Sequence, residues 1–234
     1  MWRYLAQGRG YVFEKRRRLS IMREPTLAER IAETLAQRII VGQLQPGERL
    51  RQEVFAYEFN TSHVPIREAF LRLEIRKLVV SEPRRGVRVA PLEDQDAREI
   101  MKMRSALEVM AIRGLTGKPG PRQLAKINEA LEAGDRADDL VAWEAANRAF
   151  HTALAELSRM PRLVATVADL NVAFSRQVFA QQKNDQWKPR SNHDHRRIYE
   201  ALCAAEIETA AYLLENHIWA GERYPERRKP AVVA

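Results

Sequence analysis

Residues 46–86 read PGERLRQEVFAYEFNTSHVPIREAFLRLEIRKLVVSEPRRG, and this stretch decides the fold of the N-terminal part of the chain. Pro46-Gly47 predicts a turn, and a short helix is expected over about residues 52–59. Ser62 is a favourable N-cap for the next helix. Pro65 would then lie in the first turn of that helix, where its missing N–H has no helical partner.

The helix after Ser62 has one apolar face. Apolar residues at helical spacing predict its buried side, namely Ile66, Ala69, Phe70 and Leu73. His63, Val64 and Arg67 then lie early in the helix on the outward side. Val79-Val80, a turn over 83–86 and Val87-Arg88-Val89 predict a two-stranded wing. This order of parts is that of a winged helix-turn-helix, a domain that inserts one helix into DNA.

The charge distribution supports DNA binding by this part of the chain. Residues 1–91 hold 18 Lys and Arg against 10 Asp and Glu, whereas residues 92–234 hold 21 against 21. The whole net charge of +8 therefore lies with the predicted DNA-binding segment. A positive field attracts a polyanion whatever its sequence, because bound cations release condensed counterions.

The length has room for two modest domains or one large one, and the composition is that of a folded soluble protein. The chain has 234 residues, of which 45% are hydrophobic. Cys203 is the only cysteine, which excludes an intrachain disulfide and a cysteine-based zinc site and fits a cytoplasmic location. No apolar run approaches the roughly 20 residues that span a bilayer, so no membrane partner is expected.

The expected boundaries divide the chain into four parts. Residues 1–25 are a basic extension, either a disordered arm or an addition upstream of a natural start at Met22. Residues 26–91 form the winged helix-turn-helix, beginning with a capping box in which Thr26 and Glu29 bond each other's amides. Residues 92–222 form a second domain, and residues 223–234 form a tail.

The second domain is predicted to be all helical. Gly and Pro are sparse except at 114–121, and the apolar spacing stays helical. Helices are expected at about 93–115, 121–133, 137–158, 160–186, 191–204 and 206–221. The overall fold class is therefore mainly α, with a small β wing followed by an antiparallel helical bundle.

Four polar residues of the bundle point to a metal site. Asn147 and His151 are four residues apart and share one helix face. His195 and His217 lie about ten residues on either side of the turn between the last two helices. If those helices pack antiparallel, three imidazoles and an amide oxygen converge, which suits a divalent cation. Taken singly, each histidine is better explained as a surface residue or a hydrogen-bonded core residue than as a metal ligand.

The N-terminal part resembles the DNA-binding half of the GntR family of bacterial transcription regulators. The resemblance rests on Leu44-Gln45-Pro46-Gly47-Glu48-Arg49-Leu50, on Thr61-Ser62-His63-Val64-Pro65-Ile66-Arg67-Glu68-Ala69-Phe70, and on Leu78-Val79-Val80 with Gly86. The family commonly has Arg at the place of His63 and Thr at that of Val64, which puts the usual operator in doubt. DNA contacts are expected from Arg51, Ser62, His63, Val64, Arg67, Arg84, Arg85 and Gly86.

The bundle resembles the FCD effector domain of the FadR subfamily. The matching motifs are Arg104-Ser105-Ala106-Leu107-Glu108, Asn147-Arg148-Ala149-Phe150-His151, Asp194-His195-Arg196-Arg197-Ile198-Tyr199-Glu200-Ala201 and His217-Ile218. The resemblance implies a divalent metal, zinc with nickel or manganese as alternatives, beside a pocket for a small organic acid. The implied ligands are His151, His195 and His217, with Asn147 weaker because Asp is commonest there.

Two arginines are candidates for binding the effector carboxylate. By resemblance Arg104 faces the pocket, and a guanidinium can pair two-pronged with a carboxylate. The alternative for Arg104 is an exposed salt bridge with Glu108. Arg176, on a long apolar helix, is the weaker candidate. Asp194 either orients a metal ligand or is an exposed charge at a helix start.

These features predict a ligand-responsive transcription regulator and not an enzyme. We expect a repressor that binds a pseudo-palindromic DNA operator as a homodimer and responds to a small carboxylate effector. A metal-dependent hydrolase is the alternative from another class, although no nucleophile motif or general base accompanies the histidines. A DNA-binding protein whose bundle serves only for dimerisation is the third reading.

Overall fold

The computed structural model describes residues 24–181 and 192–220 of the chain. The basic segment over residues 1–23 and the expected tail over 223–234 lie outside the described residues. The end of the helix expected over 160–186 also lies outside them. Among the described residues, no helix is both long and apolar enough to cross a membrane.

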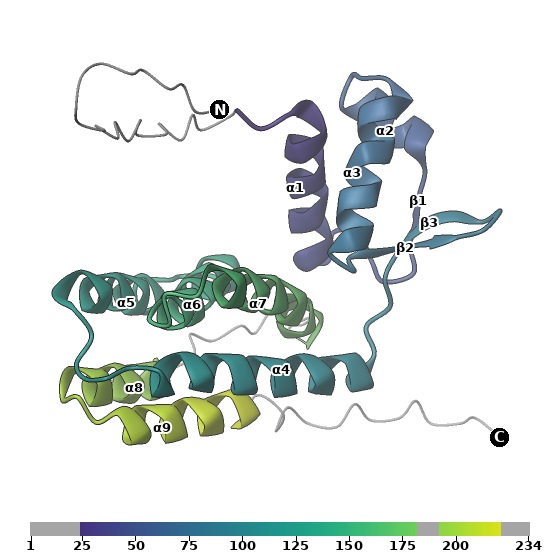
Figure 1. The fold of residues 1–234 in the computed structure, drawn as a ribbon. Helices are drawn as coiled ribbons and strands as arrows, with labels where there is room; N and C mark the ends of the chain where they lie inside the picture. Colours follow the sequence, from purple (N-terminus) through teal and green to yellow (C-terminus); the bar gives the residue numbers. More distant parts are fainter. Residues whose placement is uncertain (1–23, 182–191, 221–234) are drawn as a thin grey trace, which may run out of the picture.

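The N-terminal domain packs three helices on one small sheet (Figure 1). The helices are α1 (Leu27–Ile40), α2 (Gln52–Glu58) and α3 (His63–Ile75). The capping box at the start of α1 is confirmed: the Thr26 amide donates to Glu29 Oε2 at 2.7 Å, and the Glu29 amide donates to Thr26 Oγ1 at 3.2 Å. One apolar core joins α1, α2, α3 and the sheet.

The sheet has three antiparallel strands in the order β1-β3-β2. They are β1 (Arg49–Leu50), β2 (Val79–Glu82) and β3 (Gly86–Val89). The predicted wing is confirmed as β2 and β3, paired from Val79 opposite Val89 to Glu82 opposite Gly86. The sequence reading missed β1, which pairs with β3. Gly86 has φ +85°, a conformation that favours glycine and allows the tight wing tip.

The second part of the described chain is a bundle of six helices and contains no strand. The helices are α4 (Asp94–Arg113), α5 (Pro121–Asp135), α6 (Leu140–Glu156), α7 (Pro161–Gln181), α8 (His193–Cys203) and α9 (Ile207–Ala220). Helix α4 is central, because it contacts α6, α7 and α9 (Figure 1). The prediction of a winged helix-turn-helix followed by a helical domain is confirmed.

The two parts meet where α1 packs against α7. The segment between β3 and α4 is short, and its first residue, Ala90, is buried. The backbone carbonyl of Ala90 accepts a hydrogen bond from Arg176 Nη2 of α7 at 2.5 Å. A side chain of the bundle thus holds the start of the linker to the N-terminal domain.

Candidate nucleic-acid interface and metal centre

The start of α2, the outward surface of α3 and the wing carry the eight residues expected to contact DNA. Each of them is exposed, from the start of α2 through the N-terminal turn of α3 to the wing tip: Arg51, Ser62, His63, Val64, Arg67, Arg84, Arg85 and Gly86. The opposite face of α3 is buried. This arrangement leaves the N-terminal end of α3 available to base edges in a major groove.

Packing of the buried face fixes the orientation of α3. Ile66 and Phe70 are almost fully buried, and the ring of Phe70 meets that of Phe55 of α2 edge-on with centroids 6.0 Å apart. Ser62 occupies the N-cap position as predicted, but its side chain makes no capping hydrogen bond. The prediction that α3 begins directly after Ser62 is therefore confirmed.

The wing presents positive charge at its tip. Arg84 and Arg85 lie in the turn between β2 and β3, and the Arg85 side chain is 78% exposed. Arg88 of β3 forms an ion pair with Glu82 of β2, with Nε and Oε2 3.7 Å apart. Exposed cations of this kind suit contacts with phosphate, which position a protein on DNA without reading its sequence.

Three histidines converge inside the bundle from three helices. His151 of α6, His195 of α8 and His217 of α9 each offer a ring nitrogen, and these nitrogens lie within 4.8 Å of one another. The Nε2 atoms of His195 and His217 are 2.9 Å apart. The structure thus brings together the three histidines that the sequence singled out as candidate metal ligands.

Helix α5 sets the start of α8 and so places His195. The side-chain amide of Asn192, the residue before α8, donates to the backbone carbonyl of Leu131 at 3.2 Å and to Asp135 Oδ1 at 3.1 Å. A Cβ atom at Gly134 would collide with this amide, so glycine is required for the close approach of α5 and α8. The ring of Phe150 then stacks on that of His195, with centroids 4.2 Å apart.

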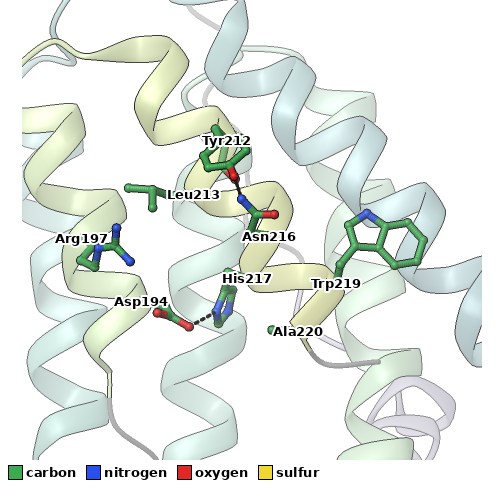
Figure 2. Close-up of a pocket in the computed structure, with 8 residues that line it drawn as sticks. All are labelled: Asp194, Arg197, Tyr212, Leu213, Asn216, His217, Trp219 and Ala220. Atoms are coloured by element: carbon green, nitrogen blue, oxygen red, sulfur yellow. Dashed lines mark hydrogen bonds and ion pairs between the residues drawn. The ribbon is translucent and has the colours of Figure 1, made fainter. Parts of the chain in front are cut away.

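Carboxylates orient two of the three imidazoles. His151 Nδ1 is 2.5 Å from Glu108 Oε2, and His217 Nδ1 is 3.6 Å from Asp194 Oδ2 (Figure 2). Both contacts leave Nε2 of the ring available. Ligating histidines commonly bond a carboxylate through their second nitrogen in this way. Asp194 accordingly lies where an orienting residue is expected.

The donor set fits a divalent cation. Burial is the largest cause that lowers the pKa of all three histidines, and the nearby Arg104 guanidinium lowers them further. Neutral imidazoles keep a lone pair for a metal. His195 and His217 cannot both carry a proton on Nε2, because these atoms face each other at hydrogen-bond distance. If neither Nε2 atom carries a proton, the lone pairs of both can be directed at one cation bound between them.

Arg104 lies beside the histidine cluster, linked to it by Glu108. Its Nε donates to Glu108 Oε1 at 3.0 Å, and its guanidinium lies over the ring of Phe174 at 5.1 Å from the centroid. The alternative reading of Arg104 had the right partner, but the pair is buried, with side chains 4% and 0% exposed. Arg104 Nη2 has no hydrogen-bond partner among the described residues.

Two buried glutamates take part that the sequence reading did not select. Glu108 bridges Arg104 and His151, and burial raises its pKa while Arg104 opposes the rise. Glu144 of α6 accepts from Asn147 Nδ2 at 3.1 Å, and burial likewise raises its pKa. The Asn147 amide group thus points its N–H toward Glu144. For Glu108, the sequence signal was its position four residues after Arg104, which places the two side chains on one helix face.

Arg176 is placed at the linker rather than beside Arg104. Its Nη2 bonds the Ala90 carbonyl, and burial lowers its pKa while Asp96 opposes this. The residue is 6% exposed. Its observed partner is therefore backbone, and a role in binding effector stays a prediction.

A surface groove of about 810 Å³ reaches the cluster from outside. It lies along α8 and α9, and His217 is one of its lining residues together with Asp194, Arg197 and Tyr212 (Figure 2). The imidazole of His217 thus separates the buried cluster from solvent.

Both halves of the chain match described protein families. Residues 27–89 match the bacterial regulatory proteins of the gntR family, and residues 99–220 match the FCD domain. The chain is 27% identical over 204 residues to a Paenarthrobacter nicotinovorans protein named "Probable D-xylose utilization operon transcriptional repressor", covering 82% of this chain and 86% of that protein.

Two further comparisons agree with these family matches. The transcriptional repressor GlaR of Escherichia coli K12 is 26% identical over 199 residues, which cover 77% of this chain and 87% of GlaR. A GntR-type regulator from Rhodococcus sp. RHA1 superposes with a TM-score of 0.73 at 27% identity, covering 83% of this chain and 95% of that structure.

Proposed function

Because this chain belongs to the GntR family of bacterial transcriptional regulators and carries the FCD domain of that family, we propose that it is a repressor controlled by a small carboxylate effector. The chain is a transcriptional regulator that binds DNA and not an enzyme, since its relatives are regulators. The names of two relatives at 26–27% identity, both repressors, support repression.

The observation that carries the proposal is the buried link from the histidine cluster to Arg104. Glu108 bonds His151 with one oxygen and Arg104 with the other. Arg104 keeps one nitrogen unpaired among the described residues and stands on the helix that follows the linker. A carboxylate bound there would lie at the middle of α4 (Asp94–Arg113).

His151, His195 and His217 would hold the metal, with zinc the first candidate and nickel or manganese the alternatives. Asn147 is the weaker fourth candidate, through its amide oxygen. When bound, the metal supplies a fixed positive charge for a carboxylate oxygen. Arg104 would orient that carboxylate through charge-assisted hydrogen bonds, worth roughly 1.5–3 kcal/mol each.

DNA recognition would use two copies of the chain. One α3 helix reads one half-site, so a two-fold operator calls for a homodimer. His63, Val64 and Arg67 would meet base edges, Ser62 backbone phosphate, and Arg51, Arg84 and Arg85 phosphates on either side, with Gly86 shaping the wing tip. Effector would act by binding one arrangement of the two DNA-binding domains more tightly than another.

Operator selection followed by effector titration tests the proposal. A two-fold DNA sequence should be selected from a random library, and the zinc-loaded protein should release it on addition of a carboxylate from a small-acid library. Arg104→Ala should keep the operator affinity and lower effector affinity roughly tenfold to hundredfold.

Arg113→Ala is the matched control for Arg104→Ala. Arg113 lies on the same helix but is exposed and paired with Glu208 at the surface. Its loss should leave the response to effector unchanged. An equal response in the Arg104 and Arg113 variants would remove Arg104 from the effector site.

A further inference from the structure

The outer face of the three-stranded sheet places two cations side by side. Strand β1 pairs with β3 so that Arg49 lies directly opposite Arg88. The neighbouring pair, Leu50 opposite Val87, faces the core of the N-terminal domain, because side chains alternate along a strand. Like charges directly opposite each other across two strands are destabilising. The pair therefore weakens the sheet unless an anion binds beside it.

Arg88 has partners within the domain, whereas Arg49 has none in the described part of the chain. Arg88 Nη1 donates to the carbonyl of Gly47 at 3.0 Å, and its Nε lies 3.7 Å from Glu82 Oε2. The exposed guanidinium of Arg49 makes no ion pair or hydrogen bond with any residue of 24–181 or 192–220. The cation without a partner is therefore the one that an external anion would bind.

Arginines that support the fold of this domain are paired with glutamates. Three such pairs join α1 to α2 and α3, namely Arg38 with Glu58, Arg72 with Glu29, and Arg76 with Glu33. Arg49 differs from them and is instead like Arg51 and Arg84, which also make no ion pair within the described residues. Both of those arginines are among the residues expected to contact DNA. The charge at Arg49 thus follows the pattern of the DNA interface and not that of the structural pairs.

Arg49 lies between two parts of the expected DNA interface. Strand β1 is an edge strand that leads directly into α2, where Arg51 is the N-cap residue (Figure 1). A Cβ atom built at Gly86 would lie 3.8 Å from both Nε and Nη2 of Arg49. The guanidinium thus reaches across the sheet to the end of the turn that carries Arg84 and Arg85. It places a positive charge between the start of α2 and the wing.

We propose that Arg49 binds a backbone phosphate of the operator, between the phosphates contacted at the start of α2 and at the wing. This contact deepens the proposed function, because it adds a residue to the same DNA interface. A phosphate oxygen would offset the repulsion between Arg49 and Arg88, and a guanidinium can bond phosphate through two N–H groups. Phosphate contacts position a protein on DNA without reading its sequence. Arg49 therefore contributes to affinity for any duplex.

The salt dependence of DNA binding by the full-length protein tests this contact. Fluorescence anisotropy measures the binding constants of the selected operator and of a random duplex between about 50 and 200 mM KCl. One phosphate contact contributes about 0.9 to the slope of log K against log salt concentration, so Arg49→Gln should lower the slope by about 0.9 per chain. Both duplexes should weaken by the same factor. Arg49→Lys keeps the charge and should keep the slope.

Arg72→Gln is the matched control, because it removes the same charge from the same domain. The Arg72 side chain is 45% exposed but lies 3.1 Å from Glu29, so its loss should leave the slope unchanged. Urea unfolding distinguishes a phosphate contact from a structural role. Removal of one of two facing cations should leave the midpoint of Arg49→Gln unchanged or higher. Arg49→Thr, whose side chain favours strands, provides the same test if Arg49→Gln does not fold.

Uncharged phosphate analogues locate the contact on the operator. A single methylphosphonate, placed at each position in turn, removes one backbone charge. At one position it should weaken binding by the wild type but not by Arg49→Gln, because that variant has already lost the contact.

The outcomes distinguish this contact from the proposed function. An unchanged slope in Arg49→Gln, or a methylphosphonate effect at every position that persists in the variant, would overturn the phosphate contact and leave the regulator standing. A loss of affinity for the operator alone would make Arg49 a base-reading residue and would overturn it too. Selection of no two-fold sequence by the wild type would overturn the proposed function, while the random duplex would still test Arg49.

Discussion

Asn147→Asp should make the stability of the bundle depend on zinc. In the structure Asn147 Nδ2 donates to Glu144 Oε2 at 3.1 Å. Aspartate would replace that donor by a second carboxylate beside a buried one. A lost bond to a charged acceptor costs about 1.5–3 kcal/mol, and two charges about 4 Å apart repel by up to about 4 kcal/mol at an effective dielectric constant of 20.

Rotation of the side chains relieves part of this repulsion, so the expected loss is about 2–4 kcal/mol of unfolding free energy without metal. Zinc should restore most of the loss, because a carboxylate oxygen binds a dication more strongly than an amide oxygen. Urea unfolding in chelator and in zinc, followed by tryptophan fluorescence, measures both values. Trp143 and Trp219, the tryptophans of the described residues, both lie in the bundle.

The control is Asn128→Asp, in which the same change is made beside Glu132 near the surface. Asn128 Nδ2 donates to Glu132 Oε1 at 2.8 Å, so the bond is alike but the setting is solvated. Its unfolding free energy should stay within about 0.5 kcal/mol of the wild type. Equal losses in the two variants would refute the argument from burial. A loss at position 147 that zinc does not restore would place this residue outside the metal site.

Three further predictions follow from the two sites and the linker. Arg67→Ala should weaken operator binding by about 1–3 kcal/mol with unchanged folding; an unchanged gel-shift titration at fixed salt would remove Arg67 from the interface. His195→Ala should reduce bound zinc from about one ion per chain to almost none by elemental analysis, and full retention would exclude a three-histidine site. Arg176→Met should keep effector affinity but reduce effector-driven DNA release about tenfold or more, because it removes a charge-assisted bond to the Ala90 carbonyl. Full release would show that this bond does not couple effector binding to DNA affinity.

Apolar periodicity and turn residues were sufficient to predict the helices and the two strands of the wing. The described ends of α5 and α8, for example, fall within two residues of those expected. Strand β1 was missed because Arg49–Leu50 is too short to show alternation. It exists only because β3 offers it a free edge, which is a tertiary contact. Local patterns carry no record of such contacts.

In the candidate site, too, local sequence patterns predicted some features, whereas tertiary contacts determine the others. His195 and His217 could be placed at similar heights because a short turn joins α8 and α9, whereas His151 of α6 was joined to them by the resemblance to the FCD domain. Burial of Arg104 with Glu108 could not be foreseen, since charged residues are rarely fully buried and the same spacing suits a surface pair.

Contacts along α7 connect the interior of the bundle to the linker, and through them ligand binding would affect the DNA-binding domain. Ser175 bonds inward to Glu144, and the next residue, Arg176, bonds the carbonyl of Ala90 at the linker. Consecutive residues on one helix cannot move independently. We therefore expect a ligand that displaces Ser175 to displace Arg176 as well. By linkage, a ligand would change DNA affinity only if it bound two arrangements of the linker unequally.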